Sequence, residues 1–140
     1  MGVPLDMLFK TQGALSMLHD PRFLALVDDA RSRISEWTVE RTHAAIAAAE
    51  PLRLVDVREE SEWARGRIPG ACHIGRGVLE RDAGHLLPDP EELIVLYCGG
   101  GYRSALAADN LVRMGYQRVV SMDGGIRGWI EAGLPLETGG

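Results

Sequence analysis

Short apolar runs alternate with amphipathic stretches along most of this chain. The clearest run, Leu-Ile-Val-Leu-Tyr at 93–97, is unbroken, as in a strand that is covered on both faces. Apolar residues then recur at helical spacing as far as Met114, and Gly115 is a typical helix stop. Similar short runs predict further strands at 34–37, 52–58, 71–74 and 117–122. We therefore expect an α/β fold, with a five-stranded parallel sheet flanked by helices on both faces.

An extra helical segment precedes the predicted sheet, so we divide the chain into an N-terminal extension, 1–33, and a domain, 34–140. Asp20 and Pro21 form an N-cap and first-turn proline for a helix with an apolar stripe. Residues 1–20 are only loosely helical. The pattern leaves two roles open for them: they cover a sheet face, or they form a homodimer contact between two subunits.

Composition and charge narrow the function classes. The net charge of −5 argues against nucleic acid and against anionic membrane surfaces as partners. No apolar run approaches the roughly 20 residues of a membrane span, and the N-terminus does not resemble an export signal. With only two cysteines we expect no disulfide framework, and the count indicates a reducing compartment, although pairing of Cys72 with Cys98 stays open. We expect a cytoplasmic protein.

Cys98 is the strongest candidate for chemistry, because it lies where strand 93–97 ends and a Gly99-Gly100-Gly101 turn begins. Glycines allow such a turn to direct its N–H groups inward, and Ser104 is predicted to cap the following helix. Amide donors and a helix N-terminus favour a thiolate, and cysteines in such surroundings have pKa values of about 3.5–7.5. The alternative is an inert buried cysteine. Placement beyond the carboxyl end of a parallel strand favours the nucleophile.

Other polar residues allow competing interpretations. Asp56 and Arg58 point to one face of their strand, at the edge where Cys98 is expected. They form either an ion pair that holds a loop or part of a substrate site. Cys72 is interpreted as a core residue and His73 as a structural histidine, because no second ligand lies at metal spacing. We expect neither a metal nor a cofactor.

Three motifs, in order, resemble the single-domain rhodanese (sulfurtransferase) family over about residues 34–135. The first is LVDVRE at 54–59, followed by EW, GRIPGA and HI. The second is YCGGGYRS at 97–104, and the third is MDGGI at 122–126, followed by Trp129 and GLP at 133–135. Cys72 and Gly75 depart from the residues that are usual in the family.

The resemblance implies that Cys98 takes the outer sulfur of a small anionic donor such as thiosulfate, forms a persulfide and passes the sulfur to a thiol or to cyanide. Arg103 would bind the donor with help from Arg58 or Arg76, and Asp56 would orient an arginine. The substrate-binding residues implied are Gly99, Gly100, Gly101, Tyr102, Arg103, Ser104 and Arg58, and the loop-supporting residues are Asp56 and Arg76. The neutral glycine loop predicts modest affinity for thiosulfate.

Three alternatives accompany this expectation. The first is a carrier that exchanges a persulfide with the thiol of a partner protein. The second is a non-catalytic binding module, whose usual sign is loss of the cysteine that is present here. The third is a cysteine-dependent phosphatase or arsenate reductase, which the loop disfavours because those enzymes carry one more residue between cysteine and arginine, and a shorter loop fits a tetrahedral oxyanion poorly.

Overall fold

Five parallel strands form one sheet in the spatial order β1-β5-β4-β2-β3. The computed structural model describes residues 19–139. Its strands are β1 (Ser35–Trp37), β2 (Arg53–Asp56), β3 (Cys72–His73), β4 (Leu93–Tyr97) and β5 (Arg118–Met122). All five predicted strands are present, and β4, whose residues are buried along its whole length, is central.

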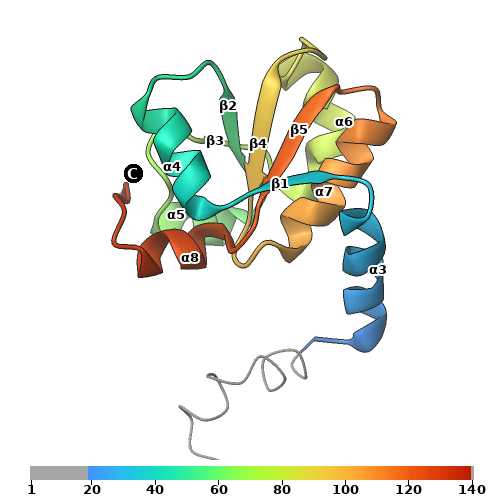
Figure 1. Ribbon diagram of the computed structural model, residues 1–140, viewed down its shortest axis with the longest axis horizontal. Helices are drawn as coiled ribbons and strands as arrows, with labels where there is room; N and C mark the ends of the chain where they lie inside the picture. The colour runs from blue at the N-terminus through green and yellow to red at the C-terminus, as the bar shows by residue number, and fades with distance from the viewer. Residues whose placement is uncertain (1–18, 140) are drawn as a thin grey trace, which may run out of the picture.

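Helices cover both faces of this sheet, as Figure 1 shows. They are α3 (Pro21–Arg31), α4 (Val39–Ala47), α5 (Glu60–Arg65), α6 (Arg76–Leu86), α7 (Tyr102–Arg113) and α8 (Gly125–Glu131). α6 and α7 pack on one face, where Leu79 and Leu111 join one apolar cluster, and α4 and α8 pack on the other, with Val39 and Trp129. The predicted α/β class is confirmed. None of these helices has the length and hydrophobicity that a bilayer crossing requires.

The extension contributes α3, which packs along α7. The predicted cap is confirmed, because Asp20 Oδ1 accepts a hydrogen bond of 2.7 Å from the Arg22 amide. Val27 and Ala30 are buried, whereas Leu26, which the sequence places in the apolar stripe, is 61% exposed. Residues 1–18, to which most of the predicted sheet-covering or homodimer segment belongs, lie outside the described residues.

α6 is longer than the sequence suggested. The sequence predicted a turn leading into a polar loop or short helix at 75–80 and a loop over 81–92, but the helix continues to Leu86. Leu79, Ala83 and Leu87 recur at four-residue spacing and are fully buried against the sheet. Burial of this stripe, which the partly buried Val78 extends, stabilises the helix although most of its other residues are polar or glycine.

Candidate active site

Cys98 lies directly after β4 at the carboxyl edge of the sheet, as predicted. Its Sγ accepts hydrogen bonds from the backbone N–H groups of Gly101, at 3.1 Å, and Ser104, at 3.3 Å. The residue is only 1% exposed, yet it lines a cavity of about 420 Å³. Two amide donors aimed at one sulfur favour negative charge on it. The site therefore combines two N–H donors aimed at a cysteine sulfur with an adjoining cavity.

Contacts with α8 hold the Cys98 loop in this shape. The N–H groups of Ile126 and Arg127 donate to the carbonyls of Cys98 and Gly99, at 2.8 and 3.0 Å. This close approach requires glycine at position 125, where a Cβ would lie 2.5 Å from the Gly99 oxygen. Because α8 binds those two carbonyls, the loop keeps the shape in which the N–H groups of Gly101 and Ser104 point at the sulfur.

Ser104 does not cap α7 as predicted. Gly101 is the N-cap residue, with φ of +99°, so that Ser104 lies within the first turn. Its hydroxyl is fully buried, 3.5 Å from Cys98 Sγ and 2.8 Å from the Ser121 hydroxyl on β5. The cap was mispredicted because a glycine in the left-handed conformation starts the helix three residues earlier. Ser104 instead links the sulfur to the sheet.

Arg103 lines the cavity, but its guanidinium is already paired with a carboxylate of the protein. Its two terminal nitrogens donate to the two oxygens of Glu62, at 2.8 and 3.1 Å. This hydrogen-bonded pair lowers the pKa of Glu62 to about 2. Glu62 also accepts from the Glu59 amide within the capping box of α5. Arg103 thus connects the Cys98 loop to α5 and offers a substrate a largely neutralised charge.

Arg58 does not reach the cavity, contrary to the substrate-binding role implied for it. Its guanidinium donates to both Asp56 oxygens, at 2.7–3.0 Å, and to the Gly66 carbonyl at 2.7 Å. Asp56 is fully buried and Arg58 is nearly so. The structure therefore agrees with the ion pair that holds a loop, because these contacts leave Arg58 no freedom to turn toward Cys98.

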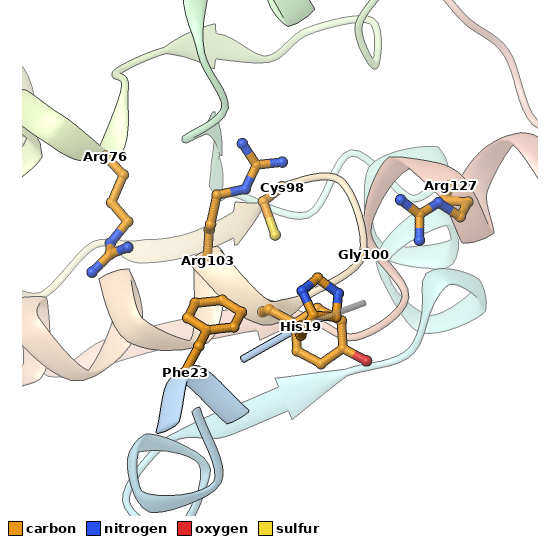
Figure 2. Close-up of a pocket in the computed structure, with 8 residues that line it drawn as sticks. His19, Phe23, Arg76, Cys98, Gly100, Arg103 and Arg127 are labelled. Atoms are coloured by element: carbon orange, nitrogen blue, oxygen red, sulfur yellow. The ribbon is translucent and has the colours of Figure 1, made fainter. Parts of the chain in front are cut away.

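The cavity brings predicted and unpredicted residues together. Arg76, Gly100, Tyr102 and Arg103 line it as expected, and His19, Phe23 and Arg127 are additions. Figure 2 shows the Cys98 sulfur directed toward His19 and Phe23, with Arg76 and Arg127 on either side. Arg127 follows the Gly124-Gly125 turn at the same sheet edge, a signal that could have identified it. Nothing in the sequence places the extension beside the loop.

Cys72 and His73 have the structural roles expected of them. Both cysteines are free thiols, and burial raises the pKa of the half-buried Cys72 thiol. The His73 ring stacks on Trp63 at 5.1 Å, and its Nε2 lies 2.7 Å from the Arg58 carbonyl. Among residues 19–139, no group of three or more His, Cys, Asp or Glu side chains is placed to hold a metal ion.

A cysteine sulfur that accepts backbone N–H hydrogen bonds at the carboxyl edge of a parallel sheet is typical of proteins that act through a cysteine. The family model of the rhodanese-like domain matches residues 38–132. The chain therefore belongs to the rhodanese family.

Individual relatives agree with this assignment. A protein named "Sulfurtransferase" from Allochromatium vinosum is 33% identical over 103 residues, which cover 74% of this chain and 94% of the relative. "Putative sulfur carrier protein YrkF" of Bacillus subtilis is 34% identical over 98 residues, covering 70% of this chain and 52% of the length of YrkF. A solved structure from Rhodopseudomonas palustris, of a protein of unknown function called "Possible Tyrosine Phosphatase", is 33% identical. It superposes with a TM-score of 0.76 over 82% of this chain and 93% of that one.

Proposed function

We propose that this chain is a sulfurtransferase that carries a sulfane sulfur on Cys98 between an anionic donor and a thiol. The observation that carries the proposal is the pair of backbone N–H groups, from Gly101 and Ser104, that converge on a cysteine sulfur at the cavity wall. The named relatives include a sulfurtransferase and a protein described as a sulfur carrier, which supports sulfur as the transferred group.

The reaction has two displacement steps. The Cys98 thiolate attacks the outer sulfur of thiosulfate, a new S–S bond forms, and the old S–S bond breaks with its electron pair leaving on sulfite. The product is a Cys98 persulfide anion, which the loop amides stabilise as they stabilise the thiolate. An acceptor thiolate, or cyanide in an assay, then attacks the outer sulfur and releases Cys98 as a thiolate.

Positive charge for the donor comes from outside the loop. Gly99, Gly100 and Gly101 provide no side chain, and Glu62 pairs with Arg103. Within residues 19–139, Arg76 and Arg127 form no salt bridge, and both line the cavity. A nitrogen of Arg127 lies 3.3 Å from the point where a Gly100 Cβ would stand. We assign recognition of the anionic donor to these two arginines.

The acceptor in the cell is a thiol, either a small molecule or a cysteine of a partner protein. A cytoplasmic location suits this chemistry, because a reducing compartment keeps Cys98 a free thiol. The edge of the cavity at the exposed Arg127 and the half-buried Gly100 gives a thiol access to the persulfide.

Formation of thiocyanate from thiosulfate and cyanide tests the proposal. Wild-type protein and Cys72→Ser should produce thiocyanate, whereas Cys98→Ser should produce none and keep its circular dichroism spectrum. Activity retained by Cys98→Ser would refute the mechanism. Hydrolysis of p-nitrophenyl phosphate, measured on the same samples, tests the phosphatase alternative, and we expect none.

A further inference from the structure

Part of the cavity lining comes from outside the part of the chain that matches the rhodanese family. His19 and Phe23 precede residue 38, where the match begins, and both line the cavity that contains Cys98. Their rings meet the Tyr102 ring, with centroids 5.0 Å apart for His19 and 6.2 Å apart for Phe23. The His19 and Phe23 centroids are 5.6 Å apart. These three rings form one surface of the cavity that Cys98 also lines, and we call this surface the aromatic wall. Figure 2 shows the Cys98 sulfur directed toward two of its members, His19 and Phe23.

Packing fixes α3, which carries Phe23 and begins just after His19, against the rest of the molecule. Val27 and Ala30 are buried, and α3 lies along α7. Just after the helix, Arg33 donates two hydrogen bonds, of 3.0 and 2.8 Å, to the buried Asp109 carboxylate of α7. That carboxylate has a lowered pKa because of the hydrogen bonds from Arg33. The wall thus has a defined position over the cavity.

Arg31 connects the same helix to the Cys98 loop itself. Its guanidinium lies 5.3 Å from the centre of the Tyr102 ring, and a nitrogen donates to the Gly101 carbonyl at 3.4 Å. It also pairs with Glu36 at 3.2 Å. The position of the aromatic wall is therefore coupled to the residue whose N–H binds the Cys98 sulfur.

The cavity has a positively charged surface and an aromatic surface, and a small inorganic donor would contact only the charged one. Arg76 and Arg127 provide positive charge, and the aromatic wall provides flat apolar surface. The volume of about 420 Å³ falls in the range of roughly 300–1,000 Å³ that is typical for organic ligands. A thiosulfate ion fills only a small part of such a space and makes no use of aromatic rings.

We infer that the substrate of this site is an organic sulfane-sulfur compound, with an aromatic or bulky apolar body attached to its anionic sulfur group. The inference rests on the proposed function and specifies its substrate class. The charged group binds Arg76 and Arg127, the body lies against His19, Phe23 and Tyr102, and the terminal sulfur faces Cys98. His19 and Phe23 are specificity-determining residues and take no part in the chemistry.

The transfer balances with an organic thiosulfonate, R–SO₂–S⁻, as the donor. The Cys98 thiolate attacks the terminal sulfur, the Sγ–S bond forms, and the bond between that sulfur and the sulfonyl sulfur breaks. The electron pair leaves with the sulfinate R–SO₂⁻, and the persulfide keeps one negative charge. No oxidant, reductant or proton donor is needed.

Two thiosulfonates that differ only in R test the inference. Benzenethiosulfonate offers an aromatic body to the wall, and methanethiosulfonate offers a methyl group. We measure kcat/KM for both with cyanide as acceptor, and compare their ratio between variants, because the ratio cancels any general loss of active protein. Phe23→Ala and His19→Ala should each lower the aromatic-to-methyl ratio, by about tenfold for Phe23→Ala, since a ring contact of this size is lost.

The control is Leu26→Ala, on the same helix but 61% exposed and outside the cavity lining, which should keep the wild-type ratio. His19 precedes the first residue of α3, so its substitution tests the wall even where Phe23→Ala loosens the helix. Unchanged ratios in both wall variants, with both donors consumed, would overturn the inference and leave the proposed function standing. Failure of wild-type protein to transfer sulfur from either thiosulfonate or from thiosulfate would overturn both.

Discussion

Gly125→Ala tests whether α8 shapes the Cys98 loop. An alanine Cβ at this position would lie 2.5 Å from the Gly99 oxygen and 2.6 Å from the Cys98 oxygen, closer than real Cβ contacts come. Both atoms belong to backbone, so no flexible side chain can give way. The start of α8 must therefore withdraw from the loop, and the hydrogen bonds from Ile126 and Arg127 are lost with it.

The expected cost has two parts. Alanine at the φ of +60° found here costs about 1–2 kcal/mol, as for any residue with a Cβ in the left-handed region. Each lost hydrogen bond adds about 0.5–1.5 kcal/mol. We expect the free energy of unfolding to fall by about 2–5 kcal/mol in total. Sulfur transfer should fall as well, because the N–H groups that face the sulfur lose their orientation.

Gly133→Ala is the matched control. Gly133 also has a positive φ, +74°, but no heavy atom of the described residues lies within 4 Å of its Cβ position. The free energy of unfolding of Gly133→Ala should fall by only about 1–2 kcal/mol, and the variant should keep sulfur-transfer activity. Urea denaturation followed by tryptophan fluorescence measures both variants. Equal destabilisation of the two, with transfer intact in Gly125→Ala, would refute the role given to α8.

Two further substitutions concern charged side chains at the site. Glu62→Gln should lower the free energy of unfolding by about 1–2 kcal/mol at neutral pH, a modest loss because the Glu62–Arg103 pair is partly exposed. Folding lowers the pKa of Glu62 from 4.5 to about 2, so the advantage of wild type is complete above pH 4.5 and should vanish as denaturation is repeated toward pH 2. A difference that is constant with pH would exclude the ion pair. Arg127→Ala should raise the KM for thiosulfate several-fold, and less so at high salt, whereas Arg118→Ala, at the opposite edge of the sheet, should not. Equal KM values for these two variants would contradict the assignment of donor binding to Arg127.

The sheet and the position of Cys98 could be predicted because each depends on local pattern. The buried run at 93–97 and the glycines after it identify a central strand and its turn from a few neighbouring residues. The length of α6 was harder to predict, since Leu79, Ala83, Leu87 and the partly buried Val78 form its apolar face and most of its other residues are polar or glycine. The apolar face of α6 can be recognised only from its contact with the sheet, which the local sequence does not show.

The partners of the charged residues could not be predicted, because they depend on contacts between segments far apart in the chain. Arg103 was expected to face the donor, and it pairs with Glu62, 41 residues earlier. Arg58 was considered for the same task, and it is held by Asp56 and the Gly66 carbonyl. His19 and Phe23 reach the cavity only because α3 packs on α7, which no motif in the extension indicates.

The central claim is that Cys98 accepts a single sulfur atom. Intact-protein mass spectrometry after incubation with thiosulfate and desalting measures this directly. The account predicts that wild type and Cys72→Ser each gain the mass of one sulfur atom, that cyanide removes it, and that Cys98→Ser gains nothing. A sulfur atom retained by Cys98→Ser, or no mass gain in wild type, would contradict it.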